Sequence, residues 1–215
     1  MSSLAYADRS ASSRTQTLFG QVMGLVALTV GFATLGVWVA RNSGGGGWFI
    51  AWLVAIGCLI GLNAANARGY HGLALGLLFA FGFLMGVSVS GTVNYYAATD
   101  PTAVRQAFGA TALFVGVLGA GGYAIRRDLS FLYRILFGLL LALLAAGIAL
   151  IFVHVEGLYT VWAVVGLVIF GLYTVVDFNR LRRAGKDQAI PLAAGIFIDV
   201  LNIFLFFLQL FGRES

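Results

Sequence analysis

Two aspartates are the first candidates for chemistry in this chain, because each interrupts a long apolar run. Asp177 lies in the stretch GLYTVVDFNRL, and Asp199 lies in GIFIDVLN about twenty residues later. A charge at the centre of a bilayer costs roughly 2.5–3.5 kcal/mol on insertion scales, so such residues usually face the interior of a helix bundle and have a partner. Each aspartate is therefore predicted to have its partner inside the protein.

The spacing suggests that the two aspartates are each other's partner. The midpoint between them is residue 188, at the polar turn formed by Lys186, Asp187 and Gln188. An antiparallel helix hairpin about this turn brings both carboxyl groups to a similar depth. Such a pair shares a proton at low pH and repels when both groups ionise. The simpler alternative is an aspartate that only hydrogen-bonds to a neighbouring helix or pairs with Arg180.

A carboxylate pair also attracts hard cations, and Ca²⁺ prefers oxygen ligands. Two carboxylates are too few for a tight calcium cage, so Asp177 and Asp199 are predicted to form a transient calcium site or a gate. Other polar residues share their helical faces at three- to four-residue spacing. They are Tyr173 and Arg180 beside Asp177, and Asn202 and Gln209 beside Asp199. These two polar stripes predict a cavity or pathway between adjacent helices.

The composition requires a membrane around these helices. Of the 215 residues, 60% are hydrophobic and 10% are charged, and the mean hydropathy is +0.96. Soluble domains carry roughly 25% charged residues. A chain of this size cannot bury so much apolar surface by itself. The net charge of +5 comes from basic residues that flank the apolar runs, so it predicts membrane topology and no nucleic-acid partner.

Seven apolar runs are long enough to span a bilayer, which takes about 20 residues in a helix. They are residues 15–40, 48–66, 71–95, 102–125, 130–154, 158–179 and 188–211. The expected fold is an all-α, polytopic bundle of seven transmembrane helices. Residues 1–14 are expected to be a disordered cytoplasmic tail, and residues 15–212 a single transmembrane domain.

The basic residues predict the orientation of this bundle. With an inside N-terminus, ten of the 13 Lys and Arg residues fall on the inner side. Only Arg41, Arg105 and Arg213 fall outside. Such an excess marks the cytoplasmic face. The chain is therefore expected in the cell membrane, with its N-terminus in the cytoplasm and its C-terminus outside.

Four pairs of glycines at four-residue spacing predict close contacts between helices, because two small residues on one face let backbones approach. The pairs are Gly20/Gly24, Gly57/Gly61, Gly72/Gly76 and Gly82/Gly86.

Three sequence blocks resemble the transmembrane Bax inhibitor-1 motif family, in its bacterial branch. They are RRDLSFL at residues 126–132, LYTVVDFNRLRR at 172–183 and IPLAAGIFIDVLNIFLFFLQLFG at 190–212. The resemblance implies a seven-helix bundle whose last helix is enclosed by the others. It also implies a pH-sensitive calcium leak, controlled by acids at the positions of Asp177 and Asp199, with no cofactor.

In this family the acids form a hydrogen-bonded latch with a cation from the end of the second helix. The corresponding stretch here is NAANARGY, which has Asn66 at the position of the family cation and Arg68 two residues later. Arg68 is therefore the expected substitute in the latch.

Two other classes of function remain open. An intramembrane aspartyl protease also uses two aspartates on neighbouring helices. However, Asp199 lacks the Gly-x-Gly-Asp and Pro-Ala-Leu motifs of presenilin-type enzymes, so the chain is not expected to be an enzyme. A regulator that transports nothing and binds a membrane protease or a stress or cell-death partner would use the acids only structurally. His71 and His154 have no other ligand at metal-binding spacing.

Overall fold

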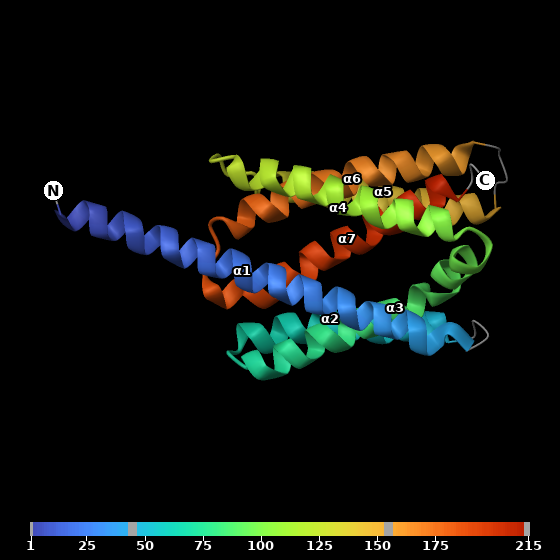
Figure 1. Cartoon of the computed structure of the whole chain (residues 1–215), viewed down its shortest axis with the longest axis horizontal. Helices are drawn as coiled ribbons and strands as arrows, with labels where there is room; N and C mark the ends of the chain where they lie inside the picture. The colour runs from blue at the N-terminus through green and yellow to red at the C-terminus, as the bar shows by residue number, and fades with distance from the viewer. Residues whose placement is uncertain (1, 43–46, 153–156, 213–215) are drawn as a thin grey trace. The chain divides into compact units, whose positions relative to one another are not determined.

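The computed structural model describes residues 2–42, 47–152 and 157–212, and the fold within these ranges is helical (Figure 1). No strand occurs in this part of the chain, and seven of its helices are long and apolar enough to span a membrane. The helices are α1 (Ser2–Val39), α2 (Trp48–Ala67), α3 (His71–Thr99), α4 (Pro101–Ala124), α5 (Leu132–Phe152), α6 (Leu158–Leu181) and α7 (Ala189–Phe211), with short 3₁₀ turns η1 (Ala40–Asn42) and η2 (Lys186–Gln188). The predicted all-α class with seven spans is confirmed.

Most helix ends lie within two residues of the predicted ones, and α3 runs four residues beyond its predicted end, to Thr99. Helix α1 continues back to Ser2, through the segment expected to be a disordered tail. No Gly or Pro interrupts that segment, and its apolar span begins only at Leu18. The described part of α5 runs to Phe152, and the predicted end of the fifth run, His154, lies outside the described residues.

Short polar segments between the helices determine where one helix ends and the next begins. Gly69 adopts a φ of 81° after α2, a left-handed conformation that favours glycine. Asp100 caps α4, because its Oδ1 accepts hydrogen bonds from the backbone N–H groups of Thr102 at 3.1 Å and Ala103 at 3.0 Å. Pro101 follows at the first helical position, where its missing N–H costs nothing.

Packing divides the chain into two compact units. The first comprises residues 1–91 and 181–197, and the second comprises residues 92–180 and 198–215. The first unit thus holds α1, α2, most of α3 and the first part of α7. The second holds α4, α5, nearly all of α6 and the second part of α7. The two aspartates therefore lie within one unit, the second.

Only one of the four glycine pairs forms a tight helix contact, so the prediction for the others was wrong. In the first unit, a Cβ at Gly82 or Gly86 would overlap the backbone of α1, at Thr29 and Ala33 respectively. Gly61 faces only the side chain of Leu77. Gly20, Gly24, Gly57, Gly72 and Gly76 have no neighbour within 4 Å of a built Cβ. The spacing alone does not show which face of a helix meets a partner.

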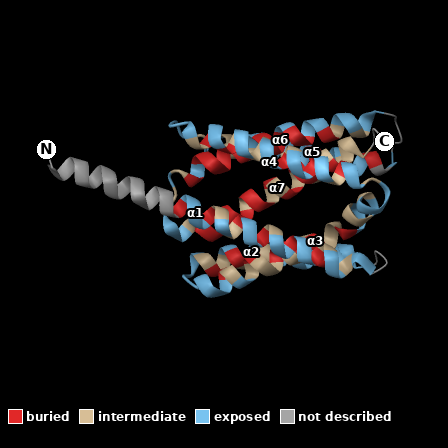
Figure 2. Cartoon of the chain, in the orientation of Figure 1, coloured by how far each residue is buried: buried red, intermediate tan, exposed pale blue. Residues whose placement is uncertain are grey.

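Helix α7 is the most buried of the spans (Figure 2). In their most apolar windows, 61% of Lys186–Phe211 and 56% of Leu158–Leu181 is buried, against 11% of Leu132–Leu150. Within the second unit, α6 and α7 approach closely, because a Cβ at Gly166 would overlap the ring of Phe206. The expectation of an enclosed last helix is thereby confirmed, and α6 and α7 provide the interior in which the acids lie.

Candidate functional site

The structure brings Asp177 of α6 and Asp199 of α7 together. Their side chains are 5% and 3% exposed, so both are enclosed by protein. The two carboxyl groups lie near enough for the charge of Asp177 to act on Asp199. Close approach of α6 and α4 supports this arrangement, since a Cβ at Gly122 would overlap the backbone of Val175. The acids form a buried carboxyl pair within the second unit.

Among the residues that the structure describes, the partners of Asp199 other than Asp177 are uncharged. Its carboxyl group hydrogen-bonds with the hydroxyl group of Thr174, which lies one turn before Asp177 on α6. The phenol of Tyr173 lies near enough to respond to the charge of Asp199. The second carboxyl oxygen, Oδ2, is buried and has no hydrogen-bond partner. A buried acceptor without a donor is costly when charged, so this site favours a neutral carboxyl group.

Asp177 has a different environment, because the guanidinium group of Arg180 acts on it from the next turn of α6. Arg180 itself is exposed at the last turn of α6, and its guanidinium carbon lies 6.0 Å from the centre of the Tyr133 ring. An adjacent positive charge stabilises a carboxylate. The pair is therefore asymmetric, because a positive charge acts on Asp177 whereas Asp199 has the hydroxyl groups of Thr174 and Tyr173 as neighbours.

The other predicted polar residues contribute less to the pair. The Nδ2 group of Asn202 donates to the carbonyl oxygen of Ile198 at 2.8 Å, on its own helix. Gln209 is half-buried two turns further along α7. Tyr173 is half-buried, and its ring lies 6.0 Å from that of Tyr133 and 5.9 Å from that of Phe170, between ring centres.

Asn66 and Arg68 belong to the first unit, so the Arg68 latch stays a prediction. Arg68 ends α2, where its backbone N–H bonds to helical carbonyl groups. The Nδ2 group of Asn66 donates to the backbone carbonyl of Asp187 at 2.7 Å, and its Oδ1 lies 3.2 Å from Nδ1 of His71. The residue at the position of the family cation thus holds the turn before α7.

Sequence reasoning missed Asn179, which is 1% exposed and fastens the segment after α4 to α6. Its Nδ2 group donates to the carbonyl oxygens of Gly122 at 3.3 Å, Ile125 at 2.8 Å and Arg127 at 3.1 Å. Its Oδ1 accepts from the backbone N–H of Leu129 at 3.2 Å. The sequence did carry a signal for this role, because Asn179 is a polar residue near the end of an apolar run. Like Asp177, such a residue is expected to have a partner inside the protein.

Replacement of Asn179 by alanine is expected to lower the free energy of unfolding by roughly 2–4 kcal/mol, because buried backbone groups lose their partner. Thermal unfolding in detergent measures the change. Asn63→Ala is the matched control, since Nδ2 of Asn63 bonds to the carbonyl oxygen of Leu59 on its own helix and Asn63 is exposed. Equal melting temperatures for the two variants would contradict this role of Asn179.

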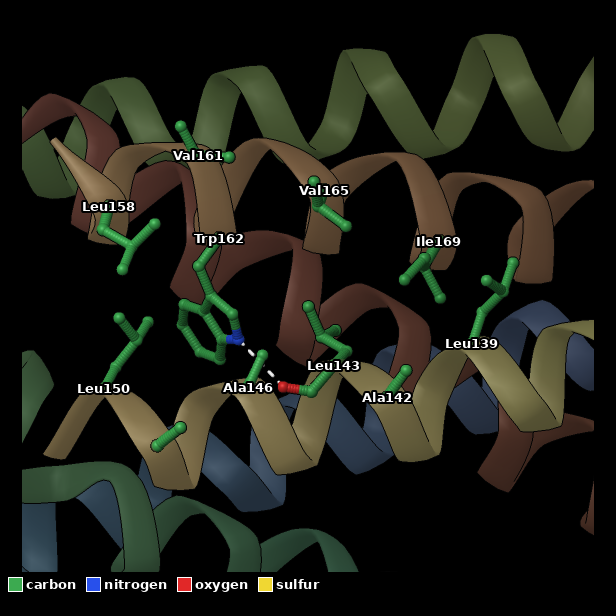
Figure 3. A pocket seen from close by; sticks show the side chains of 11 residues that line it. Leu139, Ala142, Leu143, Ala146, Leu150, Leu158, Val161, Trp162, Val165 and Ile169 are labelled. Carbon is green, nitrogen blue, oxygen red and sulfur yellow. Dashed lines mark hydrogen bonds between the residues drawn. The ribbon is translucent and has the colours of Figure 1, made fainter. Parts of the chain in front are cut away.

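A hollow between α5 and α6 is a second feature of this unit, and its chemistry differs from that of the pair (Figure 3). It has a volume of about 390 Å³, and its eleven lining side chains are all apolar, Trp162 being the only one with a polar atom. That indole N–H donates to the carbonyl oxygen of Leu143 at 2.9 Å, as the dashed line in Figure 3 shows. The hollow therefore offers an ion no ligand.

A metal-binding cluster is likewise absent from the part of the chain that the structure describes, since no three His, Cys, Asp or Glu residues come together there. The acids form a pair and no resident metal site.

The fold and the pair define a class: a seven-helix membrane protein with a buried carboxyl pair between α6 and α7. The family model described as "Inhibitor of apoptosis-promoting Bax1" matches residues 15–215. The chain therefore belongs to the Bax inhibitor-1 family, as the three sequence blocks predicted.

Bacterial relatives are similar over most of their length. An uncharacterized protein of Helicobacter pylori is 28% identical over 169 residues, which cover 78% of this chain and 71% of the relative. An uncharacterized membrane protein of Vibrio cholerae is 28% identical over 164 residues, covering 74% and 72%. The inner membrane protein YbhL of Escherichia coli is 25% identical over 221 residues, covering 93% and 92%. With its seven apolar helices, the chain is a membrane protein.

Proposed function

We propose that this protein is a pH-regulated cation leak, with Ca²⁺ as a permeant ion and the Asp177–Asp199 pair as its gate. The observation that supports the proposal is the burial of two interacting carboxyl groups in a membrane-spanning helix pair. Ionisable residues inside membrane spans commonly mark ion pathways and proton relays. A purely structural pair would gain more from apolar packing than from two acids.

The pair can act as a switch because its two ionisation states differ in repulsion. With one proton on the pair, only one carboxyl group is charged, and the repulsion between the two groups is absent. With both groups ionised, the two negative charges repel; as a general scale, two unit charges about 4 Å apart interact by about 4 kcal/mol at an effective dielectric constant near 20. Rising pH therefore favours separation of α6 and α7 at the pair. We infer that the separated state conducts.

The doubly ionised state also attracts the ion that passes. Carboxylate oxygens are preferred ligands of Ca²⁺, and a site with few ligands releases the ion readily. A transient encounter at Asp177 and Asp199 is therefore compatible with flux.

We further propose a cell-membrane location, the inner membrane in a bacterium with two membranes, with the N-terminus in the cytoplasm. Ten of 13 basic residues then lie on the cytoplasmic side. Reporter fusions to the two ends measure this orientation. A reporter that is active outside when fused to the N-terminus would contradict it.

Flux through purified protein tests the proposed function. We expect calcium-loaded proteoliposomes to release Ca²⁺ at a rate that rises with pH over the range in which the coupled carboxyl pair completes its ionisation. The double variant Asp177→Asn/Asp199→Asn is expected to lose this pH dependence, since it carries no ionisable group at the pair. Asp187→Asn is the matched control, because Asp187 is exposed in the turn between α6 and α7.

Release that equals that of protein-free liposomes at every pH would overturn the proposal and point to a partner-binding regulator. Cleavage of an added transmembrane peptide, lost in the same double variant, would point to a protease instead.

A further inference from the structure

Thr174 is a buried hydroxyl residue whose single proton has two acceptors nearby. Its side chain is 0% exposed, and Oγ1 donates to the carbonyl oxygen of Phe170 at 2.9 Å. The same hydroxyl group is a hydrogen-bond partner of the Asp199 carboxyl group. A hydroxyl group has one donor and two acceptor positions, so it cannot donate fully to both.

Two hydrogen-bond arrangements follow from this limit. When Asp199 is protonated, its O–H donates to Oγ1 of Thr174, which donates in turn to the carbonyl of Phe170. When Asp199 is ionised, the hydroxyl hydrogen turns to the carboxylate. The Phe170 carbonyl still lies within α6, where it can accept the helical bond from the fourth residue ahead. Thr174 thus has a satisfied arrangement for each proton state of Asp199.

We propose that Thr174 is a positioning residue, which holds one oxygen of Asp199 in both proton states and thereby keeps the other oxygen for the pair. This inference rests on the proposed function, because it concerns the regulation of the same site. It is supported by Oδ2 of Asp199, which is buried and has no hydrogen-bond partner. Thr174 also lies three residues before Asp177, so one face of α6 presents both groups to α7.

The charged and titratable neighbours are consistent with a specific role for this hydroxyl group. Asp177 acts on Asp199 by its charge, and Tyr173 responds to the charge of Asp199. Arg180 acts on Asp177. Thr174 is therefore a neutral group that can donate a hydrogen bond to the carboxylate without adding charge to the membrane interior.

Infrared spectroscopy of the protonated carboxyl group tests the inference without any need for ion flux. The C=O stretching band of Asp199 is assigned by its loss in Asp199→Asn, and its disappearance is followed as the pH of proteoliposomes is raised. In Thr174→Val we expect the midpoint to rise by about one to two pH units, because the carboxylate loses a donor. The band is also expected at a higher frequency at low pH, since the acid has lost its acceptor.

Thr174→Ser restores the hydroxyl group, so its midpoint is expected to equal that of the wild type. Thr29→Val is the matched control: Thr29 is equally buried, and its Oγ1 donates to the carbonyl oxygen of Leu25 at 2.7 Å in the first unit. Thr174→Ala also lacks the hydroxyl group and gives the same reading if the valine variant does not fold.

A midpoint in Thr174→Val and Thr174→Ala equal to that of Thr29→Val would overturn the inference. Its failure is distinguishable from that of the proposed function. A shifted midpoint in protein that releases no Ca²⁺ would reject the leak and support the role of Thr174. An unshifted midpoint in protein with pH-dependent Ca²⁺ release would reject the role of Thr174 and support the leak.

Discussion

Asn substitutions of the two acids are expected to have the same effect on calcium release but to leave carboxyl groups that titrate at different pH. Either variant lacks the repulsion between two carboxylates, so we expect release at high pH to fall by at least about tenfold, the rate equivalent of 1.4 kcal/mol. Asp199→Asn is expected to leave the band of Asp177, with a midpoint below that of the band left in Asp177→Asn, because Arg180 stabilises the ionised form of Asp177. Asp177→Asn is expected to keep the band, with a midpoint lower by about one to two pH units.

The asymmetry of the pair is the reason for this difference. Asp177 keeps the guanidinium charge of Arg180 when Asp199 is replaced, so a positive charge still stabilises its ionised form. Asp199 keeps only Thr174 and Tyr173 when Asp177 is replaced, and it then ionises without repulsion from a second carboxylate. Infrared titration and calcium release, measured on the same proteoliposomes, check both parts. A midpoint in Asp199→Asn at or above that in Asp177→Asn would contradict the asymmetry of the pair.

Among substitutions that change no charged residue, Gly122→Ala is expected to lower the stability of the second unit most. A Cβ at Gly122 would overlap the backbone carbonyl of Val175, and a backbone cannot move aside as a flexible side chain can. Overpacking of a well-packed contact costs roughly 1–3 kcal/mol, and occasionally more. Because Val175 lies two residues before Asp177, we also expect weaker pH dependence of calcium release.

Gly121→Ala is the matched control, since a Cβ at this neighbouring exposed glycine meets nothing within 4 Å. Alanine is the better helix former by roughly 1 kcal/mol, so the control is expected to be neutral or slightly stabilising. Melting temperatures of the two variants in detergent make the comparison. A Gly122→Ala protein as stable as Gly121→Ala would show that α4 and α6 do not meet closely here.

The sequence was sufficient for the helices because length and apolarity decide a membrane span. The run at residues 48–66, for example, becomes α2 at Trp48–Ala67, because polar residues bound it on both sides. The pairing of the two carboxyl groups could also be predicted from the sequence. A charge in a bilayer needs a partner, and the polar turn near residue 188 places the two aspartates at a similar depth. These inferences depend on the position of a residue along one helix.

What the sequence could not show depends on the direction in which a residue faces. Gly72/Gly76 and Gly82/Gly86 have the same spacing on the same helix, yet only the second pair meets α1. Thr174 and Asn179 are ordinary polar residues by type, and their roles come from groups on other segments. For Asn179 these groups lie 50–57 residues away in the chain.

The high burial of α7 also bears on how the protein is made. This helix is synthesised after the other six, so until it enters the bilayer Asp177 lacks the carboxyl partner that it has in the finished fold. We expect the unfinished chain to need protection by the insertion machinery at this stage. A chain truncated before α7 would expose an acid to lipid, which marks it for removal by membrane quality control.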